Sequence, residues 1–117
     1  MPTYADKSKD QKVKYHMGRL RGVFKNLDEN KKKIVESLIK NAAFMTVTLE
    51  ELQEDINEKG YTEEYQNGAN QWGTKQSEAV KTHIAMTRNH ATIIKTLADL
   101  APPAPKGESK LAALKKE

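Results

Sequence analysis

Two long segments with apolar residues at helical spacing constrain the fold of this chain most. In residues 34–56 apolar side chains recur every three or four positions, and Gly60 then provides a common helix stop. A second pattern follows Ser77, a good N-cap, and ends at Leu100, where the sequence APPAP prevents a helix from continuing. We therefore expect an all-α fold built on a long antiparallel helical hairpin.

A shorter helical pattern occupies residues 9–26 and predicts an additional N-terminal helix. Its apolar residues form a narrow seam, and Gly18 and Gly22 lie on the opposite side. Each glycine in a helix interior costs up to about 1 kcal/mol relative to alanine, so this helix should be the least stable of the three.

Composition favours a solvated helical protein over an all-β fold. Charged residues make up 31% of the 117 positions and aromatic residues 6%. The absence of cysteine excludes disulfides and thiolate metal sites. No apolar stretch is long enough for a membrane span, and the N-terminus lacks the apolar core of a signal peptide. We expect a soluble intracellular protein that has no membrane contact.

Charge is distributed unevenly along the chain. Residues 1–33 carry a balance of +6, residues 34–64 a balance of −6, and residues 65–117 a balance of +4. This asymmetry indicates a polyanionic partner at the N-terminal end, although a solvated lysine-rich arm would look the same. The candidate nucleic-acid contacts are Lys12, Lys14, Arg19, Arg21, Lys25, Lys31, Lys32 and Lys33.

The long helices carry more apolar surface than two helices can bury against each other. Residues 77–100 contain two apolar stripes roughly 80° apart, whereas each helix of an antiparallel pair buries one. The surplus favours self-association into a bundle, with the first helix as an alternative cover. The predicted oligomer interface comprises Phe44, Val47, His83, Met86, His90, Ile93 and Leu97.

Residues 61–76 form a long connection for a helical hairpin and hold the only tryptophan. We expect a self-satisfied loop in which Asn67 provides a turn and Trp72 plugs the loop against the helix ends. The alternative is that its amide side chains or Lys75 contact a nucleic acid or a partner protein.

The sequence contains no recognisable catalytic machinery. His83 and His90 lie two helical turns apart, about 10.5 Å, too far for one helix to present both to one metal ion. Neither a nucleophile elbow nor a phosphate-binding P-loop motif is present. We expect no catalytic residue, no metal and no cofactor, and hence not an enzyme.

A family resemblance is carried by residues 28–103, most clearly by EYQNGANQWGTKQSEAVK between the long helices and by the proline-rich sequence after them. This part of the chain resembles short phage terminase small subunits from phages of Gram-positive bacteria. The resemblance implies a non-catalytic, ring-forming helical protein. Such a protein binds viral double-stranded DNA and presents it to the terminase large subunit, an ATPase and nuclease, in the cytoplasm of the infected bacterial host.

Three functional segments follow from these patterns. Residues 1–29 would be a basic arm that contacts DNA, and residues 30–100 the helical oligomerisation core. Residues 101–117 would be a proline-rich linker and tail, with Leu111 and Leu114 either docking on the large subunit or simply frayed. The single N-terminal helix departs from the helix-turn-helix of many relatives in the wider group. The alternative function is a helical protein-interaction adaptor that does not bind DNA.

Overall fold

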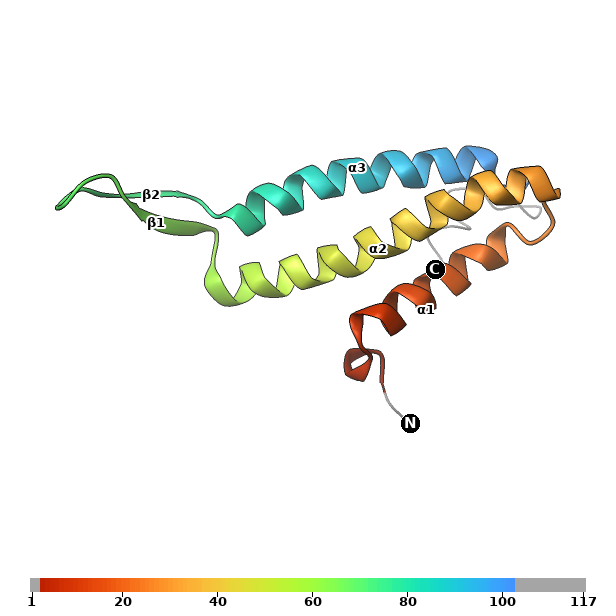
Figure 1. Ribbon diagram of the computed structural model, residues 1–117, viewed down its shortest axis with the longest axis horizontal. Coiled ribbons are helices and arrows are strands. Elements are labelled where there is room, and N and C mark those ends of the chain that lie inside the picture. The colour runs from red at the N-terminus through yellow and green to blue at the C-terminus, as the bar shows by residue number, and fades with distance from the viewer. Residues whose placement is uncertain (1–2, 103–117) are drawn as a thin grey trace, which may run out of the picture.

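The computed structural model describes residues 3–102, so the predictions for Leu111 and Leu114 lie outside the described residues. A short 3-10 helix, η1, precedes three α-helices, and a pair of strands stands between the last two (Figure 1). In chain order the elements are η1 (Tyr4–Asp6), α1 (Lys9–Val23), α2 (Glu29–Lys59), β1 (Thr62–Gln66), β2 (Trp72–Gln76) and α3 (Glu78–Leu100).

Helices α2 and α3 run antiparallel, and α1 packs on α2 near the end that is remote from the strands (Figure 1). The described chain is elongated, with extents of 63 × 34 × 28 Å. The predicted helical hairpin and its additional N-terminal helix are confirmed, and the molecule is predominantly helical.

Side chains that accept backbone hydrogen bonds set the starts of the helices. Ser8 Oγ accepts from the backbone N–H of Gln11 at 3.2 Å, and Ser77 Oγ accepts from that of Val80 at 3.1 Å. Asp28 does the same for Lys31 at 2.9 Å, so Asp28 is the N-cap of α2. The three consecutive lysines, Lys31, Lys32 and Lys33, therefore lie at the beginning of α2.

The connection between α2 and α3 is a β-hairpin, so the all-α prediction is wrong for this segment. Strands β1 and β2 pair antiparallel, with Thr62 opposite Gln76 and Gln66 opposite Trp72. The turn is closed by a hydrogen bond from the Asn67 N–H to the Gln71 carbonyl at 2.8 Å. Backbone groups are thus satisfied mainly by cross-strand pairing, and not by a loop of amide side chains.

The predicted plug role of Trp72 is also wrong, because this side chain is 65% exposed. The hairpin projects beyond the ends of both helices (Figure 1), and Trp72 begins β2 at the end of that strand farther along the chain from α3. Asn67 does take part in the turn, at the position that the sequence assigns to it.

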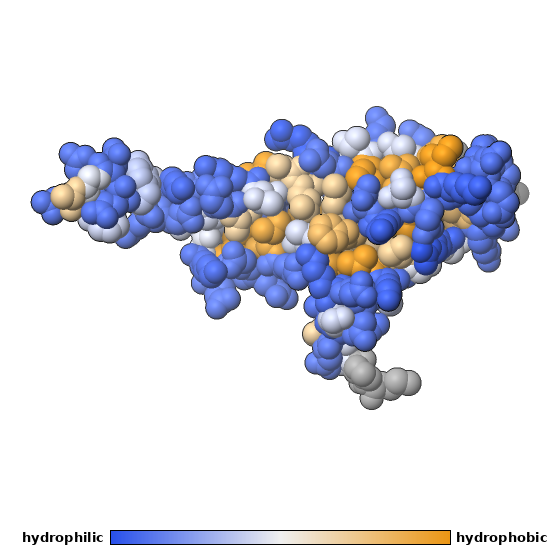
Figure 2. Space-filling model, viewed as in Figure 1, coloured by the Kyte–Doolittle hydropathy of each residue, from blue (hydrophilic) through white to orange (hydrophobic). Residues whose placement is uncertain are grey.

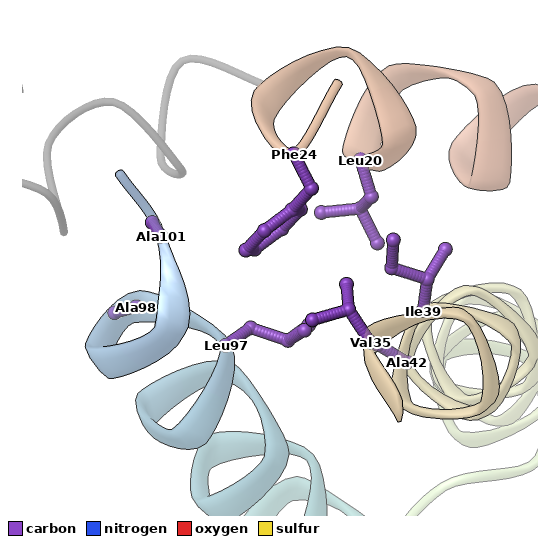
Figure 3. Packing of buried hydrophobic residues seen from close by; sticks show 8 residues of the cluster. All are labelled: Leu20, Phe24, Val35, Ile39, Ala42, Leu97, Ala98 and Ala101. Carbon is purple, nitrogen blue, oxygen red and sulfur yellow. The ribbon is translucent and has the colours of Figure 1, made fainter. Parts of the chain in front are cut away.

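The main hydrophobic core lies at the end of the molecule opposite the hairpin and draws on all three α-helices (Figure 3). Helix α1 contributes Leu20, and Phe24 follows at its C-cap with 3% of its surface exposed. The basic N-terminal segment is therefore packed into the helical body. The buried cluster comprises Leu20, Phe24, Val35, Ile39, Ala42, Leu97, Ala98 and Ala101.

Candidate nucleic-acid interface

The outer side of α1 carries an exposed tyrosine ring between cations. Tyr15 is 41% exposed, and Lys7 Nζ lies 4.7 Å from the centroid of its ring. The guanidinium carbon of Arg19 lies 5.5 Å from the same centroid, and Arg19 Nη1 donates to Tyr15 Oη at 3.2 Å. Aromatic rings that alternate with cations suit both phosphate contact and stacking.

Tyr4 holds η1 against α1 and α2. Its hydroxyl donates to the Glu50 carboxylate on α2 and lies 2.9 Å from His16 Nε2 on α1. Its ring contacts Tyr15 edge-on, with centroids 5.6 Å apart, and Lys12 Nζ lies 5.3 Å from the Tyr4 centroid. Burial, together with the hydrogen bond to Glu50, raises the pKa of Tyr4, so the hydroxyl remains a donor.

Arg21 and Lys14, two of the predicted nucleic-acid contacts, are engaged within the chain. Arg21 Nε lies 3.1 Å from each Glu36 oxygen, and Arg21 Nη2 also contacts that carboxylate. The hydrogen bond to Glu36 raises the pKa of Arg21, and its counterpart lowers the pKa of Glu36. Lys14 Nζ lies 3.2 Å from Asp10 in an exposed pair one turn earlier on α1.

The turn between α1 and α2 gathers four more of the predicted lysines at one end of the molecule. Lys32 Nζ lies 4.0 Å from Glu29, whereas Lys25, Lys31 and Lys33 are exposed and enter no ion pair with residues 3–102. The positive end of the α2 dipole adds to their field, which favours an anion at this corner. Figure 2 shows that this end of the molecule is hydrophilic. The four residues are Lys25, Lys31, Lys32 and Lys33.

The sequence-based prediction names Lys12 and Arg19 but not the tyrosine rings that lie beside them. Lys12 and Arg19 stand beside tyrosine rings, whereas Lys14 and Arg21 line the other flank of α1. Tyr4, Lys7 and Tyr15 were missed, although tyrosines interleaved with lysines are visible in YADKSKDQKVKYH.

Two predicted oligomer contacts, Val47 and Leu97, are buried within the chain and are not available to a neighbour. Their exposed fractions are 1% and 0%. Leu97 is enclosed because α1 closes over the α2–α3 pair and brings Phe24 toward it (Figure 3). The prediction is wrong for these two residues because a single chain already encloses both, and for Leu97 the first helix provides part of the cover.

The other predicted contacts keep some exposed surface. Phe44 is 49% exposed, and His83, Met86 and Ile93 are half-buried. His90 is half-buried as well, and its Nε2 lies 3.0 Å from Thr46 Oγ1 on the neighbouring helix.

A groove of ≈ 900 Å³ opens between α1 and α2, on the flank of α1 that carries Lys14 and Arg21. Its apolar lining comes from Val13, Met17 and Phe44. Lys9 spans one side, with Nζ 4.5 Å from the Phe44 ring centroid and 2.8 Å from Glu51. The remaining lining residues are Asp10, Lys14, Arg21, Lys40 and Asn41.

Within residues 3–102 no group of three or more metal-ligating side chains is arranged to hold a metal ion. In the same part of the chain no helix has both the length and the apolar character needed to cross a bilayer. Comparisons with protein-family models, with curated proteins and with solved structures find no significant match to this chain.

Proposed function

We propose that this chain is the small subunit of a phage terminase, which binds viral double-stranded DNA and presents it to the terminase large subunit. It would act as a homo-oligomer, in ring form, in the cytoplasm of the infected bacterial host. The family resemblance of residues 28–103 suggests the class. The structural observation that carries DNA binding is the cationic surface along α1 and around the α1–α2 turn.

The chemistry of this surface suits the DNA backbone. Lys7 and Arg19 stand beside an exposed ring, so an approaching phosphate would meet cations with their side chains already positioned. Lys25, Lys31 and Lys33 add charge without an acid among residues 3–102 to displace. A chain that neutralises a few phosphates binds weakly and with strong salt dependence, and several linked copies multiply that affinity.

Self-association draws support from apolar surface that one copy leaves uncovered. Ile84 on α3 is 46% exposed, and Phe44 on α2 is half-exposed. The two strands of the hairpin also offer edges to which no further strand within residues 3–102 is paired.

Gel retardation over a range of salt concentrations tests the DNA proposal. The test variant replaces Lys25, Lys31 and Lys33 by glutamine. The control replaces Lys81, Arg88 and Lys95 on α3 by glutamine and so changes net charge equally. We expect the test variant to lose affinity and to show a shallower dependence of log K on log salt, while the control retains most of the wild-type affinity.

Equal losses in both variants would mean that only net charge matters, which would contradict the assigned surface. Wild-type protein without salt-sensitive DNA affinity would favour the second candidate function, a protein-interaction adaptor. The specific observation in favour of an adaptor is the apolar groove between α1 and α2. An adaptor would still form an oligomer, so the oligomeric state does not separate the two functions.

A further inference from the structure

The projecting hairpin exposes more aromatic surface than a solvated turn requires. Tyr61 is 73% exposed, and Trp72 is nearly as exposed. Tyr65, in contrast, lies over Gly73 across the strand pair, where a Cβ atom would come within 2.8 Å of the ring. Tyr65 therefore has a partner within the hairpin, whereas the rings of Tyr61 and Trp72 remain open to an external one.

The α1–α2 groove has the complementary form. It is concave and lined by Val13, Met17 and the half-exposed Phe44, and its volume lies within the range of pockets that enclose drug-sized molecules. An indole ring is smaller than such molecules, so the groove has ample room for Trp72. The projecting Trp72 ring and the α1–α2 groove lie on different parts of the same chain.

The charges of the two surfaces are also complementary. Three of the four cations that line the groove already have an acidic partner within the chain, since Lys9 pairs with Glu51, Lys14 with Asp10 and Arg21 with Glu36. Lys40 is the lining cation that enters no ion pair within residues 3–102. The hairpin strands contain Glu63 and Glu64 against Lys75. Lys75 Nζ lies 3.4 Å from Glu63, which leaves Glu64 as the exposed carboxylate that enters no ion pair within residues 3–102.

The hairpin does not reach the groove of its own chain. Phe44 lies about 22 Å along the α2 axis from the last residue of that helix, Lys59. The hairpin begins beyond that end and points away from α1 (Figure 1). Any hairpin in the groove therefore belongs to another molecule.

We propose that the β-hairpin of one copy docks in the α1–α2 groove of a second copy. Trp72 would enter between Met17 and Phe44, and Glu64 would face Lys40. The contact joins two different surfaces, so its repetition generates a ring when the rotation closes and a filament when it does not. This proposal rests on the self-association in the proposed function and names the surfaces that would produce it.

A mixing experiment tests the contact directly. Trp72→Ala removes the inserted ring and leaves the groove intact, and Phe44→Glu places a like charge opposite Glu64 and leaves the hairpin intact. We expect each variant alone to sediment as a monomer at concentrations where the wild type associates. Equal amounts of the two variants should form dimers with one copy of each, because that pair retains one complete contact.

The complementation also demonstrates that both variants fold. Ile34→Ala, a truncation of an exposed residue outside both surfaces, should associate as the wild type does. Ile84→Glu tests the rival contact through the α3 stripe, and it too should associate normally. Trp72 is the only tryptophan, so its emission should move to shorter wavelength as wild-type protein associates, and this shift should be absent in Phe44→Glu.

Normal association of Trp72→Ala would overturn the docking proposal and leave self-association itself standing. Failure of the mixture to form dimers would overturn it as well. Wild-type protein that is monomeric at every concentration would refute both the contact and the oligomer. DNA retention by such a monomer would still support the nucleic-acid surface, so the proposals fail separately.

Discussion

Thr46 Oγ1 lies 3.0 Å from His90 Nε2, in a hydrogen bond that joins α2 to α3. The Thr46 hydroxyl donates to the Ala42 carbonyl at 2.9 Å, so Nε2 of His90 is the donor in this pair. Burial lowers the pKa of His90 from its ordinary value of 6.5. The folded protein therefore holds this histidine neutral at pH values where the unfolded chain begins to protonate it.

This relationship predicts a loss of stability in acid. The contribution of His90 is fully present above about pH 6.5 and falls as the pH drops below that value, because the unfolded chain binds the proton more readily. The unfolding temperature should fall between about pH 7.5 and about pH 5.5, and His90→Gln should reduce that fall. His83→Gln, the same change on the same helix, is the control. An unchanged fall in His90→Gln would contradict the prediction.

Leu97→Ala should be the more damaging of two truncations on α3. Leu97 is fully enclosed by the core, so its truncation leaves a cavity and should cost about 2–5 kcal/mol of unfolding free energy. Ile84→Ala, at an exposed position, should cost about 0.5 kcal/mol or less. Urea unfolding of the two variants measures the difference, and equal losses would contradict the enclosure of Leu97 in the core.

Glu36→Gln should weaken folding slightly and strengthen DNA binding. The pair with Arg21 is about half-exposed, so its loss should cost less than about 1 kcal/mol in urea unfolding. The released guanidinium and the lost negative charge should both increase retention of DNA at low salt. Glu54→Gln makes the same charge change elsewhere on α2 and should gain less. An equal gain in DNA retention in both variants would indicate that the Arg21 guanidinium itself makes no contact with DNA.

Tyr4→Phe should release η1 while the helical body stays folded. The substitution removes the hydroxyl that contacts Glu50 and His16 and keeps the ring. Trypsin should therefore cleave after Lys7 and Lys9 faster than in the wild type, with the midpoint of global unfolding almost unchanged. Tyr61→Phe, at an exposed ring on the hairpin, should leave the cleavage rate unaltered. A wild-type cleavage rate in Tyr4→Phe would mean that the ring contacts alone hold η1.

The helices were predictable because their signals are local. Ser8, Asp28 and Ser77 each cap the helix that they precede, and the apolar period between the caps is long. The hairpin was missed although Asn67 and Gly68 form a common hairpin-turn pair, since the flanking strands are only five residues each and mostly polar. The alternation of apolar and polar residues gives little evidence for a strand in so short and polar a segment.

Features that depend on packing between distant segments could not be read from the chain. The pair of Arg21 with Glu36 and the bond from Tyr4 to Glu50 exist only because α1 returns along α2. The same return buries Leu97, which the stripe pattern alone had left for a neighbouring subunit. The positions of lysine and arginine in the sequence indicate where a cationic surface lies, but acidic side chains that pair with it can come from distant segments of the chain.

The main core lies at one end of the α2–α3 pair, and this has a consequence for how the molecule would respond to load. The buried positions of α2 fall between Val35 and Val47, and those of α3 are Leu97 and Ala98. Amide protons near these residues should exchange slowest, and those near the hairpin should exchange sooner. A pull on the strands would thus separate the weakly packed helix ends first, while the lysine-bearing corner keeps its shape.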